Sequence, residues 1–502
     1  MHETRILLDD LPARVGRLKA EFRARARSFS FFGLSGWLLF FGLVGALLIG
    51  LYPDADQQDS AYHYLFARWA GRHPAYFVSV WARPLFTTLY WLPAQAGYDA
   101  ARLFTLGIAL AAGWQTARVA QAQGLARAEL AVPMLFLQPS FFLLSTGCYT
   151  ETLFALVFAI GLRLHLAGRV RAGMLVGSLL ILARPEGLFL GVLWGVWGLC
   201  ALGWRRGLVA GPLPAGGMLL WWGAALAITG DPQWIRHDWP PDWQVDGKAN
   251  GTGPLWWFLA QLPLIVGPLL LPPFLLGLWR ALRRRELPEA ASAFLLLFVA
   301  HSLMFWRGWF GSAGYARYLV CVSPAIALLS LAGWNRLCER IPRRTRLAIA
   351  APAAALSLLA CLLYLDGWKP SRDARAIQTM HAWFRQHEHP VAQLIHSQAY
   401  ARILWDRDVW EKPSLGSQRE ENLAVLRRAP AGTLVLWDDD TGPRFFRLRP
   451  EDFEAAGFQT LHAQTFRLPG LLFPLPWERS QFGAVREQRM TLLYKSDAAT
   501  RR

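Results

Sequence analysis

Long apolar runs recur along most of the chain, and they limit the folds that it can adopt. An α-helix needs about 20 mostly apolar residues to cross the hydrocarbon layer of a membrane. Because 54% of the 502 residues are hydrophobic, the chain is too apolar and too long for one soluble domain. The sequence therefore predicts a polytopic α-helical membrane protein with about 11 spans. These lie near 29–50, 100–120, 129–146, 150–167, 172–184, 187–203, 208–229, 255–279, 290–306, 318–334 and 347–366.

Basic residues are concentrated in short segments between the apolar runs and before the first of them. The net charge is +17, but clusters such as 280–285 and 336–346 have the pattern of cytoplasmic loops. A nucleic-acid-binding protein would gather such residues in one basic patch, so we expect no nucleic-acid partner. The long first run, with no cleavage site after it, predicts an uncleaved first span behind a cytoplasmic N-terminus.

An odd number of spans then places the C-terminal part of the chain outside the cytoplasm. We divide the chain into the basic N-terminus 1–28, a transmembrane domain 29–366 with a first outer loop at 51–99, and an extracytoplasmic region 367–502. The sequence thus predicts an integral, multi-pass protein of the plasma or inner membrane.

Region 367–502 has the composition of a soluble domain. Its alternation of helical and strand-like patterns predicts a small α/β domain. The helical patterns lie at 372–387 and 419–428, and the strand-like ones at 391–395, 433–437 and 490–494. Asp438-Asp439-Asp440, after a predicted strand, fits a solvated turn better than a metal site. The five cysteines have no metal-ligand spacing and imply no disulfide framework.

Acidic residues gather in the first outer loop, directly after the first span. Asp54, Asp56 and Asp59 precede Tyr62 and His63, an unusual concentration of polar groups beside hydrocarbon. A partly buried carboxylate here fits a general base, which takes a proton from an attacking hydroxyl group. The alternative is a solvated, turn-forming loop. We select Asp59 as the base, because it is nearest to the helical pattern that follows, with Asp56 as the second choice.

Two amphipathic helices are predicted to lie along the membrane interface within the same loop. The first is expected at 60–71 and the second at 81–96. Arg83 and the proline after it fit the start of the second helix, because proline is favoured at the first helical position.

Three short turns on the predicted outer face also carry charges. Arg184 and Glu186 interrupt an apolar run, which is costly unless they face water, each other or a ligand, although the same residues would fit a simple tight turn. The glycine-rich segment 306–318 includes Arg317, which could hold a phosphate or anchor the interface. Glu151 is either a second acid of the site or a favourable charge at a helix N-terminus.

These motifs in this order resemble the GT-C superfamily of glycosyltransferases, and its mannosyltransferase-like members are the most similar. The resemblance implies a cell-envelope enzyme that transfers a sugar, such as mannose, from a polyprenyl-phosphate donor to a lipid, glycan or protein acceptor on the external face. It assigns the base to Asp59 or Asp56 and the lipid phosphate to Arg184 and Arg317. The acids of this chain are spread over three positions, where family members often have two adjacent ones.

Further residues near the motifs are expected to contact the donor. These are Tyr62, His63, Arg83, Glu151 and Glu186. Arginine can stabilise a phosphate leaving group, so a divalent metal is compatible with the site but not required, and we assign no metal ligand or other cofactor.

Two other classes of protein have to be weighed against this assignment. A transporter or flippase of lipid-linked sugars would place ionisable groups near the membrane midplane and show an internal repeat; here the acids cluster at one face and no repeat is evident. A membrane scaffold would not need carboxylates beside a span. The sequence therefore favours the enzyme.

Overall fold

The computed structural model describes most of the chain, and its residues fall into two compact units. The described residues are 31–52, 57–240, 243, 251–339, 341–367, 370–387, 389–411, 415–416, 418–468 and 486–496. A helical unit comprises Met1–Ala46, Thr105–Ser145 and Thr150–Cys361, and a mixed unit comprises Leu47–Phe104, Thr146–Tyr149 and Leu362–Arg502. The predicted domain boundaries stay predictions.

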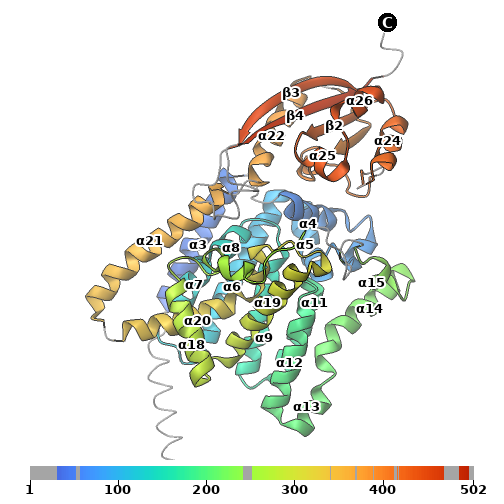
Figure 1. Ribbon diagram of the computed structural model, residues 1–502. Coiled ribbons are helices and arrows are strands. Elements are labelled where there is room, and N and C mark those ends of the chain that lie inside the picture. The colour runs from blue at the N-terminus through green and yellow to red at the C-terminus, as the bar shows by residue number, and fades with distance from the viewer. Residues whose placement is uncertain are drawn as a thin grey trace, which may run out of the picture. The chain divides into compact units, whose positions relative to one another are not determined.

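The helical unit consists mainly of α-helices (Figure 1). Three helices, α3 (Phe31–Leu51), α6 (Tyr98–Ala122) and α21 (Arg343–Gly367), continue from one unit into the other. The others are α7 (Ala131–Phe136), α8 (Pro139–Leu144), α9 (Thr150–Leu166), α10 (Val170–Ser178), α11 (Leu180–Ala183), α12 (Gly187–Leu202), α13 (Trp204–Ala210), α14 (Gly216–Thr229), α15 (Trp234–His237), α16 (Trp257–Ala260), α17 (Leu262–Ile265), α18 (Leu271–Arg284), α19 (Pro288–Arg307) and α20 (Ser323–Cys338). The 3-10 segments are η2 (Ala128–Leu130), η3 (Leu213–Ala215), η5 (Trp309–Gly311) and η6 (Ala316–Val322).

Apolar helices are the main component of this unit, as the sequence predicted. Within the part of the chain that the structure describes, 4 helices are long and apolar enough to cross a membrane: Gly33–Leu51, Trp204–Thr229, Pro288–Arg307 and Ala316–Cys338. Shorter apolar helices are Val170–Ala183, Gly187–Leu202 and Ala348–Leu362. The mostly helical membrane class is therefore confirmed, whereas the number of spans stays a prediction.

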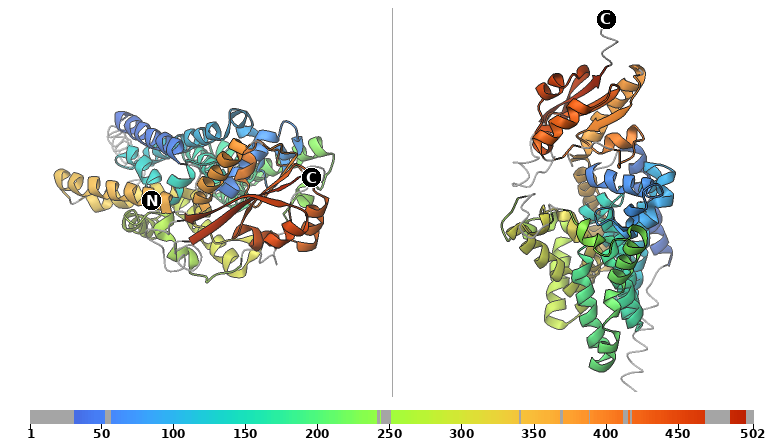
Figure 2. Two further views of the ribbon diagram at one scale, coloured as in Figure 1. Left: turned by 90° about the horizontal axis from the view of Figure 1, so that it is seen from above. Right: turned by 90° about the vertical axis from the view of Figure 1, so that its right-hand side faces the viewer.

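Close helix packing in this unit depends on glycine. Helices α18 and α20 lie side by side (Figures 1 and 2), and a Cβ atom added at Gly277 would lie 1.9 Å from the carbonyl oxygen of Leu329. One added at Gly333 would lie 1.8 Å from the carbonyl oxygen of Pro273. Small residues let the backbones of two membrane helices approach in this way, so the contact leaves no room for any other residue at these positions.

The mixed unit contains a four-stranded sheet in the order β1-β2-β4-β3. Strand β1 is parallel to β2, whereas β2 and β3 each pair antiparallel with β4. The strands are β1 (Gln393–His396), β2 (Thr433–Asp438), β3 (Gln459–Leu468) and β4 (Arg486–Lys495). The helices of this unit are α4 (Gln57–Trp69), α5 (Pro84–Gln95), α22 (Pro370–His387), α23 (Tyr400–Leu404), α24 (Arg419–Arg428), α25 (Thr441–Phe446) and α26 (Pro450–Ala455), with the 3-10 segment η1 (Pro74–Val78).

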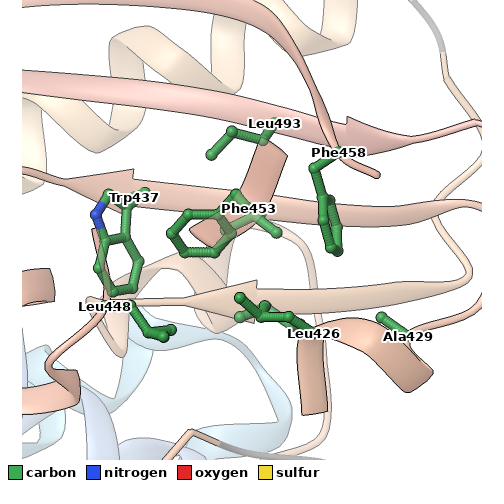
Figure 3. Close-up of a cluster of buried hydrophobic side chains, with 9 residues drawn as sticks. Leu426, Ala429, Trp437, Leu448, Phe453, Phe458 and Leu493 are labelled. Carbon is green, nitrogen blue, oxygen red and sulfur yellow. The ribbon is translucent and has the colours of Figure 1, made fainter. Parts of the chain in front are cut away.

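Helices cover both faces of this sheet. On one face Trp437 of β2 and Leu493 of β4 pack with Leu426 of α24 and Phe453 of α26 (Figure 3). Full burial of such side chains stabilises the fold by about 1.5–3 kcal/mol each. Helix α22 packs against β3 and β4, where Trp383 stacks on His462 with ring centroids 4.4 Å apart. The predicted helices at 372–387 and 419–428 and the strands near 391–395, 433–437 and 490–494 are confirmed, but β3 was not predicted.

Both helices predicted in the first outer loop are present, and α5 begins with Pro84 after Arg83, as expected. Helix α4, however, is buried on most sides. It packs against α5 and α23, and Arg68 forms a 2.6 Å ion pair with Asp406. Helix α4 is thus enclosed by protein within the mixed unit, and its position along the membrane interface stays a prediction.

Candidate functional site

Four charged side chains from separate segments of the helical unit meet in its interior. We call them the ionic cluster: Glu151 in the first turn of α9, Arg184 and Glu186 in the turn between α11 and α12, and Arg317 in η6. All four are buried. Burial of charges in an apolar protein is costly unless they are paired and hydrogen-bonded, so the four side chains need partners.

Arg184 is the centre of the ionic cluster. Its guanidinium forms ion pairs of 2.8 Å with Glu151 Oε1 and 2.8 Å with Glu186 Oε1. Arg184 Nε also donates to Glu186 Oε2 at 3.2 Å, and Nη1 donates to the Thr150 hydroxyl at 2.9 Å. Because a guanidinium has five N–H groups, these contacts leave little capacity for a further ligand. Arg184 thus holds the two carboxylates in place.

The turn that carries Arg184 and Glu186 is tight for a steric reason. A Cβ atom at Gly187 would lie 2.3 Å from the backbone nitrogen of Ile181, so α12 begins in contact with the end of α11. Arg184 is extended, with φ −162° and ψ 149°, and Pro185 follows it. The Arg-Pro-Glu-Gly sequence therefore turns the chain sharply and brings the arginine and the glutamate together.

Arg317 has a weaker connection to the ionic cluster. Its Nε atom lies 3.8 Å from Glu151 Oε1, which is beyond hydrogen-bond distance. The guanidinium lies over the ring of Tyr315, 4.9 Å from the centroid. Arg317 is thus buried beside a carboxylate that Arg184 already neutralises, an arrangement that suits an anion-binding side chain.

The glycine-rich segment before Arg317 has a backbone that other residues adopt only with strain. Gly308, Gly311 and Gly314 all have positive φ angles, of 71°, 62° and 67°. The carbonyl oxygen of Gly314 accepts hydrogen bonds of 2.7 Å from both Trp257 Nε1 and Gln261 Nε2. These bonds fix the segment that leads into η6 and so define where Arg317 lies.

Two aromatic side chains beside the ionic cluster were not selected from the sequence. The guanidinium carbon of Arg184 lies 5.7 Å from the ring centroid of Tyr318, which stacks on His301 of α19 with centroids 5.0 Å apart. His301 is 2% exposed. One signal was available, because an ionisable residue within an apolar span suggests a functional site.

The predicted first-loop residues belong to the mixed unit. Asp59 lies in the first turn of α4, and burial raises the pKa of the Tyr62 phenol, against the opposing charge of Arg402. His63 is buried, with its ring 5.3 Å from that of Phe86. Arg83 is also buried, and its Nη1 donates to the Val80 carbonyl oxygen at 2.9 Å.

Asp54 and Asp56 lie outside the described residues. Within the described ranges, no group of three or more His, Cys, Asp or Glu residues could hold a metal ion.

Comparison with known proteins shows a relationship in structure rather than in sequence. No protein-family model matches the chain, and no curated protein is significantly similar to it. The crystal structure of ArnT from Cupriavidus metallidurans in the apo state superposes with a TM-score of 0.58 at 14% identity, covering 91% of this chain and 98% of that one. The structure of the same protein bound to undecaprenyl phosphate gives a TM-score of 0.59 at 14% identity, covering 92% and 98%.

A TM-score at this level over nearly the whole length of both chains establishes a common fold. The chain thus shares the fold of ArnT, in agreement with the resemblance that the sequence motifs indicated.

Proposed function

We propose that this protein transfers a sugar from a polyprenyl-phosphate donor to an acceptor hydroxyl group on the extracytoplasmic side of the membrane. The observation that carries the proposal is the buried ionic cluster, which contains two arginines within an apolar protein. The structural similarity to a protein whose structure contains undecaprenyl phosphate supports the class of donor. We favour mannose as the sugar and a lipid, glycan or protein as the acceptor.

The two arginines have different proposed roles. Arg184 is engaged by Glu151, Glu186 and Thr150, so it organises the cluster. Arg317 is a second buried guanidinium beside the cluster, with its Nε 3.8 Å from Glu151 Oε1, and a guanidinium binds phosphate oxygens well. We therefore assign the donor phosphate to Arg317 first, and Arg184 supports it by neutralising Glu151.

The proposed reaction is a single displacement. The acceptor oxygen forms a bond to the anomeric carbon of the sugar while the bond from that carbon to the phosphate oxygen breaks. Asp59, or Asp56, takes the proton of the acceptor hydroxyl. The polyprenyl phosphate leaves with the bonding electrons, and the guanidinium of Arg317 stabilises the added negative charge. Attack opposite to the leaving group inverts the configuration at the anomeric carbon.

The proposal is tested with purified protein in lipid nanodiscs. The protein is incubated with a panel of polyprenyl-phosphate-linked hexoses and pentoses and candidate acceptors, and released polyprenyl phosphate is quantified. We expect release with at least one donor. If no donor is cleaved, but lipid-linked sugar crosses the bilayer of proteoliposomes, the protein is a transporter and the proposal is wrong.

Variants then test the assigned residues. Asp59→Asn should abolish release while leaving the thermal midpoint unchanged, because the amide cannot accept the proton. An active Asp59→Asn protein together with an inactive Asp56→Asn protein would move the base to Asp56. Arg317→Ala should weaken use of the donor. Its matched control is Arg205→Ala, which removes an exposed arginine that stacks on Trp204 and should leave use of the donor unchanged.

A further inference from the structure

His301 is a buried polar side chain whose ring nitrogens have no hydrogen-bond partner among the described residues. It is 2% exposed, and neither Nδ1 nor Nε2 is hydrogen-bonded to any of the described residues. Buried polar groups are nearly always hydrogen-bonded, because an unsatisfied one loses its water without compensation. Two such atoms on a single side chain point to a ligand that supplies the partners.

The surroundings of His301 connect it to the ionic cluster. Its ring stacks on Tyr318, with centroids 5.0 Å apart and planes inclined by 23°. The ring centroid of Phe258 lies 5.9 Å from that of His301. Arg184 and Glu186 are near enough to interact electrostatically with the imidazole. The two aromatic rings fix the plane of the imidazole, so its nitrogens have a defined direction before any ligand binds.

The chemistry of the ring restricts what this ligand can be. Apolar surroundings favour the uncharged imidazole, in which one nitrogen donates a hydrogen bond and the other accepts one. An ionised phosphate only accepts, so it satisfies the first nitrogen and not the second. A hydroxyl group both donates and accepts, so neighbouring hydroxyl groups satisfy both nitrogens.

We propose that His301 binds hydroxyl groups of the sugar that the lipid donor carries. This inference rests on the proposed glycosyl transfer, and it divides the site into a phosphate-binding part at Arg317 and a sugar-binding part at His301. His301 is a specificity-determining residue in this scheme, because it contacts the group transferred and takes no proton from the acceptor.

The test measures binding of two ligands to the full-length protein in nanodiscs. The ligands are polyprenyl phosphate without a sugar and the polyprenyl-phosphate sugar that the wild-type protein cleaves. His301→Phe keeps an aromatic ring at this position but removes both nitrogens, so it should bind the glycosylated donor about ten- to a hundredfold more weakly. Its affinity for polyprenyl phosphate should be unchanged.

His165, another buried histidine, provides a matched control. It lies in the last turn of α9, whereas Glu151 of the ionic cluster lies in the first turn. Fourteen residues of helix separate the two by about 20 Å. His165→Phe should therefore leave the affinities for both ligands unchanged. If His301→Phe loses affinity for both ligands equally, the phosphate lies at His301 and the inference is overturned. Unchanged affinity for both ligands would also overturn it.

A second variant covers the case in which His301→Phe does not fold. His301→Gln keeps one donor and one acceptor and should bind the glycosylated donor more tightly than His301→Ala. In the wild-type protein, a donor that lacks the contacted hydroxyl group should bind more weakly, whereas His301→Ala should not distinguish it from the complete donor. If His301→Ala discriminates the two donors as well as wild type, the inference is wrong. A wild-type protein that binds neither ligand would instead refute the proposed function.

Discussion

Replacing Arg184 by methionine should destabilise the protein far more than the same replacement of Arg317. Arg184 forms two ion pairs of 2.8 Å, whereas Arg317 lies 3.8 Å from its carboxylate. With an effective dielectric constant of about 20, Coulomb's law gives about 6 kcal/mol for each short pair and about 4 kcal/mol for the longer one. The attraction is thus roughly 12 kcal/mol for the two ion pairs of Arg184 and roughly 4 kcal/mol for the contact between Arg317 and Glu151, before desolvation is counted.

Desolvation of the guanidinium offsets most of this attraction. Removing one partner of a buried ion pair costs about 3–5 kcal/mol in practice, and we expect this loss for Arg184→Met. The threefold smaller attraction between Arg317 and Glu151 contributes about 1–2 kcal/mol to the loss in Arg317→Met. Since the loss arises from carboxylates left unpaired, Arg184→Met combined with Glu186→Gln should be more stable than Arg184→Met alone.

The assay is thermal unfolding in nanodiscs, followed by tryptophan fluorescence at one fixed heating rate, because membrane proteins commonly unfold irreversibly. Activity is measured on the same preparations. Arg317→Met should lose donor use while keeping a midpoint near that of wild type, and Arg184→Met should lose both. A larger fall in midpoint for Arg317→Met than for Arg184→Met would refute the division of roles between the two arginines.

Two further predictions concern the fold. Gly277→Ala should destabilise the protein by about 1–3 kcal/mol or more and so lower its thermal midpoint, because the added Cβ atom would lie 1.9 Å from the Leu329 carbonyl oxygen. The control is Gly223→Ala, which should not destabilise, because nothing lies within 4 Å of the added Cβ atom. In the mixed unit, burial and then the charge of Arg402 lower the pKa of His396 well below its usual value, and its Nε2 accepts a 2.7 Å hydrogen bond from Arg402. The unfolded chain therefore takes up the proton more readily, so this stability is complete above about pH 6.5 and falls as the pH drops below it. Melting curves of wild type and His396→Gln across this range should show a shallower pH dependence in the variant, and identical profiles would contradict the assignment.

Much of the ionic cluster could be predicted from local sequence. Arg184 and Glu186 interrupt an apolar run, and charges in such a place have to find partners. Glu151 and Arg317 were selected from their positions at the ends of apolar runs. Their meeting in one cluster could not be derived from the sequence, because it depends on how α9, α12 and η6 pack.

The features that were missed have physical reasons. His301 lies in the middle of an apolar run, and its neighbour Tyr318 approaches it only through the glycine-rich turn. Strand β3 has polar residues on both faces and pairs with β4 alone at the edge of the sheet, so it lacks the apolar alternation that marks a strand. Helix α4 has an amphipathic sequence, but packing against α23, more than 300 residues later in the chain, covers its remaining face.

A structure of the protein with an uncleaved polyprenyl-phosphate sugar bound would test most directly the claim that the ionic cluster is the donor site. We predict a phosphate oxygen within hydrogen-bond distance of the Arg317 guanidinium, and sugar hydroxyl groups at the ring nitrogens of His301. Donor bound elsewhere, with Arg317 still beside Glu151 and His301 uncontacted, would contradict the account.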